Sequence, residues 1–131
     1  MAISYITIGS NNLERSKRFY AAVLPLIGAE AGFEMPAEAF SFRLRDGVSI
    51  WISKPFDRKV AVSGNGGMIA FDAASEDDVR AAHAAAMSNG GSNEGEPGPR
   101  PQYGPEFFGG YVRDPDGTKM CFVFRRKVPK S

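Results

Sequence analysis

The chain contains one histidine and one cysteine, so few of its side chains suit nucleophilic, general-base or soft metal chemistry. The single Cys121 excludes an internal disulfide and any zinc site built from several cysteines. No general base is recognisable beside it, so we interpret it first as a small buried apolar residue. His83 falls in a predicted helix, where we expect it partly buried or at the surface. The sequence therefore identifies no catalytic residue.

The composition is typical of one globular domain with no affinity for nucleic acid or membranes. The chain has 131 residues, of which 43% are hydrophobic and 24% charged. The chain has 16 Lys and Arg residues and 15 Asp and Glu residues, and this near-balance of charge provides no general attraction for polyanions. No secretory signal and no run of 18 apolar residues is visible. We therefore expect a cytoplasmic protein.

The periodicity of apolar residues predicts two helices, at 13–24 and 75–87, and several strands. The strands are predicted at 3–8, 40–45, 48–53, 68–72, 107–113 and 118–124. Residues 92–105 hold four prolines and three glycines, which predicts a connection that is neither helix nor interior strand.

The order of these elements occurs twice along the chain. Three pairs of residues with matching positions in the two halves, Tyr5 and Met68, Tyr20 and His83, and Gly28 and Gly91, are each 63 residues apart. We infer two β-α-β-β-β modules, in each of which one strand is less clearly marked. The predicted boundaries are about 1–56 for module one, 57–67 for a link, 68–125 for module two and 126–131 for a basic tail, all within a single domain, 1–131.

Several short motifs resemble the glyoxalase, bleomycin-resistance and extradiol-dioxygenase superfamily, also called vicinal oxygen chelate proteins. They are Tyr5-Ile6-Thr7-Ile8 running into Leu13-Glu14-Arg15-Ser16 and Phe19-Tyr20, the restart Met68-Ile69-Ala70-Phe71, and Asp114-Pro115-Asp116-Gly117. The resemblance covers nearly the whole chain. It implies an α+β fold in which two modules, related by pseudo-twofold symmetry, place curved mixed sheets around a cleft. It also suggests a homodimer.

Metal-dependent members of that superfamily hold a divalent cation between the modules. The resemblance implies a His at the start of each module, a Glu on the final strand and, in some members, a Glu or Gln from the last strand of module one. The chain has Tyr5 and Met68 at the His positions, Cys121 at the Glu position and Trp51 at the optional one. These side chains do not suit Mg²⁺, Mn²⁺ or Fe²⁺. We therefore expect no metal and no cofactor.

Strand alternation predicts which side chains face the cleft. The expected ligand-binding residues are Tyr5, Arg43, Trp51, Met68, Tyr111 and Cys121. We expect Arg43 to anchor an anionic group, as the only charged side chain that the alternation turns inward. Residues 102–108 are interpreted either as an aromatic lid or as a surface loop held by its own rings.

Three functions remain open at the level of sequence. The first is a glyoxalase-like protein that binds a small organic ligand in an aromatic cleft without a metal. The second is an active lyase or dioxygenase of the superfamily whose ligands lie at unexpected positions. The third is a structural, dimerising module whose cleft is filled by its own side chains.

Overall fold

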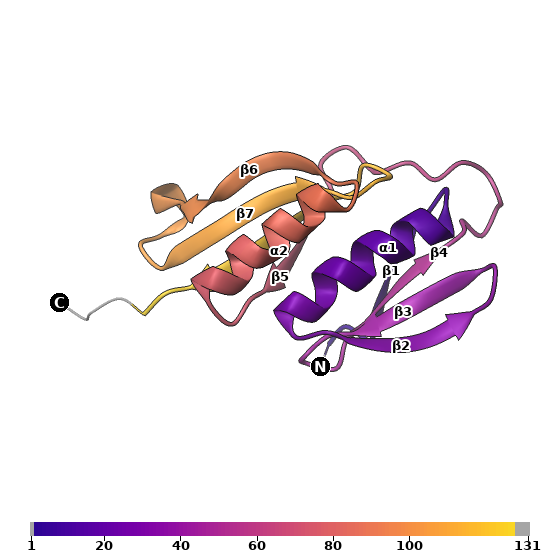
Figure 1. Cartoon of the computed structure of the whole chain (residues 1–131), viewed down its shortest axis with the longest axis horizontal. Coiled ribbons are helices and arrows are strands. Elements are labelled where there is room, and N and C mark those ends of the chain that lie inside the picture. Colours follow the sequence, from indigo (N-terminus) through magenta and orange to yellow (C-terminus); the bar gives the residue numbers. More distant parts are fainter. Residues whose placement is uncertain (1, 128–131) are drawn as a thin grey trace.

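The computed structural model describes residues 2–127; residues 128–131 of the predicted basic tail lie outside the described residues. Within residues 2–127, two helices, eight strands and two short 3-10 helices follow one another (Figure 1). The elements are β1 (Tyr5–Gly9), α1 (Leu13–Val23), η1 (Leu24–Ile27), β2 (Glu30–Met35), β3 (Ala39–Arg43), β4 (Ser49–Ser53), β5 (Ile69–Asp72), α2 (Glu76–Ser88), β6 (Ser92–Pro99), η2 (Pro101–Tyr103), β7 (Phe107–Arg113) and β8 (Lys119–Arg125).

The strands form two four-stranded mixed sheets with the same internal order. Sheet A has the order β1-β4-β3-β2 and sheet B the order β5-β8-β7-β6. The strand β1 pairs in parallel with β4, and β5 pairs in parallel with β8. All the other neighbouring strands are antiparallel. This repeated topology confirms the predicted α+β fold of two β-α-β-β-β modules.

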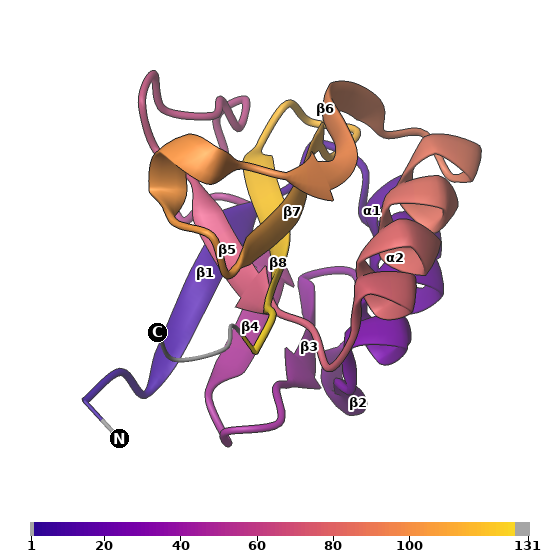
Figure 2. The ribbon, with the colours of Figure 1, turned by 90° about the vertical axis from the view of Figure 1, so that its left-hand side faces the viewer.

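Both helices cover the same side of the molecule, one over each sheet (Figures 1 and 2). The Asn12 side chain caps α1 by accepting from the Arg15 N–H, and Ser75 caps α2 in the same way through the Asp78 N–H. Beneath the helices lies one core cluster with members from both modules, among them Phe19, Ile50 and Phe122. No helix among residues 2–127 is long and apolar enough to cross a membrane.

Alternation along the strands separates a helix-facing side from an open side in each sheet. The residues Ile50, Ile52 and Phe122 face the helices and are fully buried in the core. The opposite side chains define what we call the open face of each sheet. They include Tyr5 and Trp51 in sheet A and Tyr111 and Cys121 in sheet B.

Two strands were not marked in the sequence, and both lie at sheet edges. In sheet A this strand is β2, and in sheet B it is β6, which occupies most of the predicted Pro-rich connection. An edge strand tolerates prolines because one side of its backbone needs no partner. The prediction that residues 92–105 contain no interior strand is therefore confirmed, while their interpretation as a simple connection is wrong.

The turn between β7 and β8 fastens the second module to the first. The Asp116 carboxylate accepts from the Asn11 N–H, from Arg15 at 2.7 Å and from the Ser16 hydroxyl at 3.1 Å, at the beginning of α1. The Asp114 carboxylate accepts from the Tyr20 hydroxyl at 2.5 Å. The Asp-Pro-Asp-Gly motif thus joins the modules as well as making a turn.

Candidate functional site

The open face of sheet A carries Tyr5, Arg43 and Trp51, which we call half-site A. Trp51 on β4 lies opposite Thr7 on β1 and Ser41 on β3. Tyr5 is 62% exposed, Trp51 is half-buried and Arg43 is exposed. The residues are therefore accessible, and they present aromatic surface with one guanidinium.

Met68, Tyr111 and Cys121 form half-site B, on and beside the open face of sheet B. Tyr111 lies directly opposite Cys121 on the paired strands β7 and β8, and Met68 immediately precedes β5. Burial, and then the neighbouring Cys121, raises the pKa of Tyr111 to about 12. Cys121 is only 1% exposed, and burial raises the pKa of its thiol. Both groups are thus protonated at neutral pH, and the thiol is a poor nucleophile.

The two half-sites occupy different sheets of the chain. The strands of sheet A and sheet B do not pair with each other, and the modules meet through α1, α2 and η1. No hydrogen bond or aromatic contact found within residues 2–127 joins a residue of half-site A to one of half-site B. The six residues predicted for one cleft therefore form two separate groups within one chain.

Sheet B also carries cations that the sequence analysis missed. Arg100 and Lys119 lie over the Tyr111 ring, and Arg125 lies over the Phe107 ring. The expectation that Arg43 is the only charged residue facing the open side is therefore wrong. Strand alternation in the sequence does indicate two of these cations, because Lys119 and Arg125 point to the same face of β8 as Cys121.

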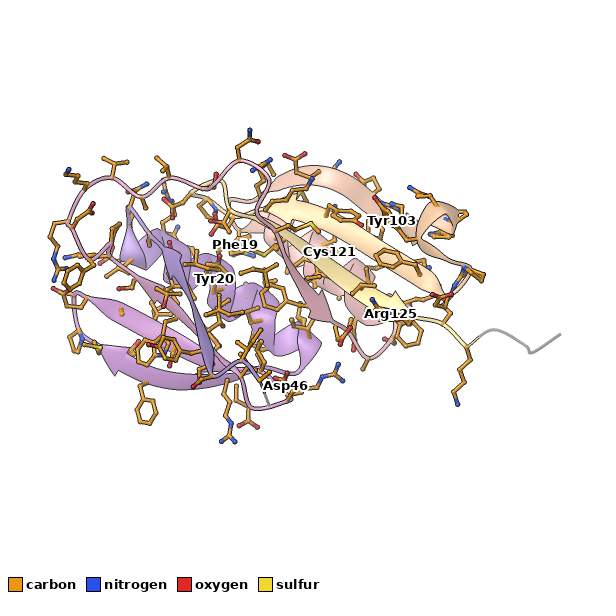
Figure 3. All side chains as sticks on the ribbon, turned by 180° about the vertical axis from the view of Figure 1, so that it is seen from behind. Phe19, Tyr20, Asp46, Tyr103, Cys121 and Arg125 are labelled. Carbon is orange, nitrogen blue, oxygen red and sulfur yellow. The ribbon has the colours of Figure 1, made fainter. Side chains whose placement is uncertain are left out.

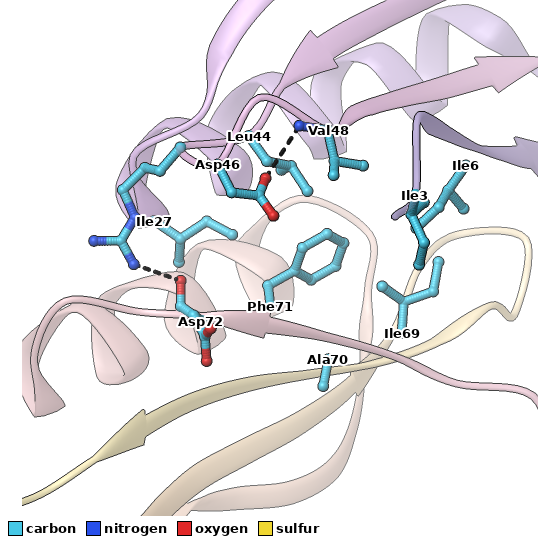
Figure 4. A pocket seen from close by; sticks show the side chains of 11 residues that line it. Ile3, Ile6, Ile27, Leu44, Asp46, Val48, Ile69, Ala70, Phe71 and Asp72 are labelled. Carbon is cyan, nitrogen blue, oxygen red and sulfur yellow. Dashed lines mark hydrogen bonds between the residues drawn. The ribbon is translucent and has the colours of Figure 1, made fainter. Parts of the chain in front are cut away.

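One cavity lies away from both half-sites, between the edge strands β1 and β5 (Figure 4). Its volume is about 500 Å³, and its walls are mainly apolar side chains on the helix-facing side of the sheets, such as Ile6, Ile69 and Phe71. Arg45 donates to the Asp72 carbonyl at its rim. A second cavity of about 490 Å³ lies between Thr7 and residues 53–62, and a third of about 280 Å³ is lined by Met68, Lys119 and residues 64–67.

His83 is more buried than expected. It is 4% exposed, and its Nε2 lies 3.0 Å from the Asn93 Oδ1. Its counterpart in the repeat, Tyr20, is also buried on the inner side of its helix. Both residues thus fasten the helices to neighbouring elements.

The side chains at the four superfamily metal positions do not fit a hard divalent cation. Tyr5 and Trp51 lie on sheet A, whereas Met68 and the protonated Cys121 thiol belong to sheet B. Such cations require carboxylate, carbonyl or imidazole donors. Among residues 2–127, no three His, Cys, Asp or Glu side chains are grouped closely enough to hold a metal ion.

The fold agrees with comparisons to known proteins. The family model of the Glyoxalase/Bleomycin resistance protein/Dioxygenase superfamily matches residues 2–122, and the chain belongs to this superfamily. It is similar to a glyoxalase/bleomycin resistance protein from Albidiferax ferrireducens T118, with 33% identity, a TM-score of 0.84, and coverage of 95% of this chain and 99% of that one.

Two further solved structures share the fold at lower identity. A glyoxalase-related enzyme from Fulvimarina pelagi has 24% identity and a TM-score of 0.75, covering 95% of this chain and 88% of that one. Lactoylglutathione lyase from Agrobacterium tumefaciens has 16% identity and a TM-score of 0.64, covering 94% and 92%. A search of curated proteins found no match.

Proposed function

We propose that this protein binds a small organic ligand on the aromatic open faces of its sheets, without a catalytic divalent metal. The proposal rests on the resemblance, which implies that Tyr5, Trp51, Met68 and Cys121 occupy positions where metal-dependent superfamily members have His, Glu or Gln ligands. Aromatic and apolar walls with a few polar anchors are typical of small-molecule sites. The ligand-binding residues in this proposal are Tyr5, Arg43, Trp51, Met68, Tyr111 and Cys121.

The proposal includes a homodimer, because each chain offers two half-sites on separate sheets. An open sheet A face on one chain and an open sheet B face on another would together enclose a ligand. The exposed apolar side chains Tyr5, Phe33, Phe56 and Met68 favour such an arrangement, since a monomer would leave them in water. A cytoplasmic location, expected from the sequence, remains part of the proposal.

Trp51 provides a direct test because it is the only tryptophan of the chain. We would titrate the protein with nitrobenzyl alcohol, an uncharged aromatic quencher, and with nitrobenzoate, while recording Trp51 emission. Binding at half-site A predicts saturable quenching by at least one of the two compounds. Tyr5→Ala should weaken it, whereas Lys59→Ala, at an exposed side chain outside both half-sites, should not. Only linear, collisional quenching by both compounds would contradict the proposal and favour the filled, structural module.

A further inference from the structure

Three cations stand over the aromatic rings of the open face of sheet B. The Arg100 Cζ lies 5.5 Å from the centroid of the Tyr111 ring, and the Lys119 Nζ lies 5.8 Å from the same centroid. The Arg125 Cζ lies 5.9 Å from the centroid of the Phe107 ring. Positive charge is therefore concentrated on this face, although the whole chain is nearly neutral.

Two of these cations are not neutralised by an ion pair. Arg125 pairs with Asp72, whereas Arg100 and Lys119 form no ion pair with a carboxylate among residues 2–127. Glu94 is the carboxylate within electrostatic reach of Lys119, and Arg113 already binds it. An anion that approaches Tyr111 would thus meet two available positive charges.

Arg100 is held in place rather than free in solvent. Its guanidinium donates to the carbonyls of Glu96 at 2.6 Å, Gly98 at 3.0 Å and Pro99 at 3.3 Å. Gly95 leaves room for this arrangement, because a Cβ there would lie 3.1 Å from the Tyr111 ring and 3.2 Å from the Arg100 Nη2. A fixed guanidinium loses little conformational freedom when it binds an anion.

The surroundings of this pair are accessible. Lys119 lines the cavity of about 280 Å³ beside Met68. Tyr103 of η2 is 60% exposed, and its ring contacts Phe107 edge-on, with centroids 5.3 Å apart. Seen from behind, Cys121 and Arg125 lie on β8 of sheet B, and Tyr103 of η2 lies in the same part of the molecule (Figure 3). A charged region with an exposed ring at its edge suits a planar molecule that carries an acidic group.

We propose that the open face of sheet B binds the carboxylate of a small aromatic acid between Arg100 and Lys119, with the ring of the acid against Tyr103. This inference rests on the proposed function and names the class of ligand. Charge-assisted hydrogen bonds from guanidinium and ammonium groups are stronger than neutral ones, so charge decides which aromatic molecules bind. The anionic group is assigned to sheet B and not to Arg43.

The test compares nitrobenzoate with nitrobenzyl alcohol, two ring systems of similar size that differ in charge. Amide chemical shifts in a nitrogen-15-labelled sample report affinity and position together. We expect nitrobenzoate to bind about tenfold more tightly than nitrobenzyl alcohol, because one charge-assisted hydrogen bond contributes about that much affinity. Its shift changes should centre on Gly95, Gly98 and Lys119.

Variants of the two cations test their roles separately. Arg100→Ala and Lys119→Ala should each weaken nitrobenzoate binding about tenfold and leave nitrobenzyl alcohol unaffected. Lys119→Arg should restore binding because the positive charge returns. Gly95→Ala keeps both charges but crowds the Arg100 guanidinium, so it should also weaken the acid. Arg80→Ala, which removes an exposed arginine that lies over the core ring of Phe108 and not over Tyr111, is the matched control. The amide spectra show for each variant whether the fold is intact.

Each result supports or overturns a particular claim. Equal binding of acid and alcohol would overturn this inference and leave the proposed function standing. Loss of acid binding in Arg43→Ala, with Arg100→Ala unaffected, would move the anion to sheet A and likewise overturn it. Failure of both compounds to bind would overturn this inference and the proposed function together.

Discussion

At the scale of single residues, the Tyr20–Asp114 pair is the most buried polar interaction between the modules. The Tyr20 ring is fully buried, and Asp114 is only 4% exposed. Besides the Tyr20 hydroxyl, the Asp114 carboxylate accepts the N–H groups of Asp116 and Thr118, both at 2.9 Å. A buried carboxylate that loses such a partner is costly, because water cannot replace the donor.

Tyr20→Phe should therefore lower the free energy of unfolding by about 1–3 kcal/mol. The substitution keeps the aromatic packing and removes only the hydroxyl that donates to Asp114. Urea unfolding followed by circular dichroism measures the change. Tyr103→Phe, at an exposed ring, is the control and should leave stability unchanged. Equal stabilities of Tyr20→Phe and the parent chain would show that the hydrogen bond contributes nothing.

Asp114 should also give stability a particular dependence on pH. Burial raises the pKa of Asp114 in the folded protein, outweighing the hydrogen bonds from Tyr20 and the turn that lower it. As the pH rises, Asp114 loses its proton first in the unfolded chain and only at higher pH in the folded protein. Between these two pKa values the folded protein binds more protons, so a rise in pH favours unfolding. The free energy of unfolding of the parent chain should thus fall relative to Asp114→Asn from about pH 4 upward, then level off.

The difference in the free energy of unfolding between the parent chain and Asp114→Asn isolates the contribution of Asp114. Glu38 and Glu94, whose pKa values are lowered by hydrogen bonds from Arg58 and Arg113, are present in both chains and cancel. Urea unfolding of each protein at several pH values between 4 and 8 measures the difference. A difference that is constant, or that rises with pH, would contradict the raised pKa.

At the scale of elements, the β7–β8 turn and the beginning of α1 act as one unit. The Asp116 side chain is 2% exposed and accepts from the Asn11 N–H, Arg15 and Ser16. A carboxylate at the N-terminus of a helix also interacts favourably with the helix dipole. One side chain therefore accepts three hydrogen bonds that join the two modules.

Asp116→Ala should lower the free energy of unfolding by about 1.5–3 kcal/mol, the range for hydrogen bonds to a charged group. Hydrogen exchange should speed up in the first turn of α1, which loses its partner. The control is Asp77→Ala, which removes an exposed ion pair with Arg80 at the beginning of α2 and should lower the free energy of unfolding by less than about 1 kcal/mol. If both variants behave alike, the turn does not fasten the modules.

Most elements could be predicted from the sequence because alternation and capping are local signals. Asn12 and Ser75 cap the two helices close to the predicted beginnings at residues 13 and 75, and the apolar face of β4 packs against the core. The strand β6 was missed because Pro97, Pro99 and its glycines oppose strand formation locally. Pairing with β7 at the sheet edge overrides that local preference.

The candidate site was less predictable, for a geometric reason. Alternation shows which residues share a face within one sheet, and Tyr111 and Cys121 do share one. It does not show how two sheets lie relative to each other, so the separation of half-site A from half-site B was not visible. Arg100 lies outside the regular strands, and only the folded path of β6 brings it to Tyr111.

At the scale of the whole molecule, the proposed homodimer predicts a mass in solution near twice the 14.2 kDa of the chain. Light scattering coupled to size exclusion at micromolar concentration measures it. Tyr5→Arg places a charge on the exposed face of sheet A and should shift the population toward monomer, because burying an unpaired charge is unfavourable. Lys59→Glu, outside both half-sites, is the control. A parent chain that runs as a monomer would contradict the dimer.

The metal content of the protein decides between the proposed function, which requires no catalytic metal, and a metal-dependent enzyme. The untagged protein, produced in medium supplemented with zinc, nickel, manganese and iron, would be dialysed and analysed by mass spectrometry of the elements. We predict far less than one metal ion per chain, and no change in Cys121→Ser. One bound ion per chain that disappears in a folded Cys121→Ser or Tyr5→Phe variant would contradict the account and favour a metal-dependent enzyme.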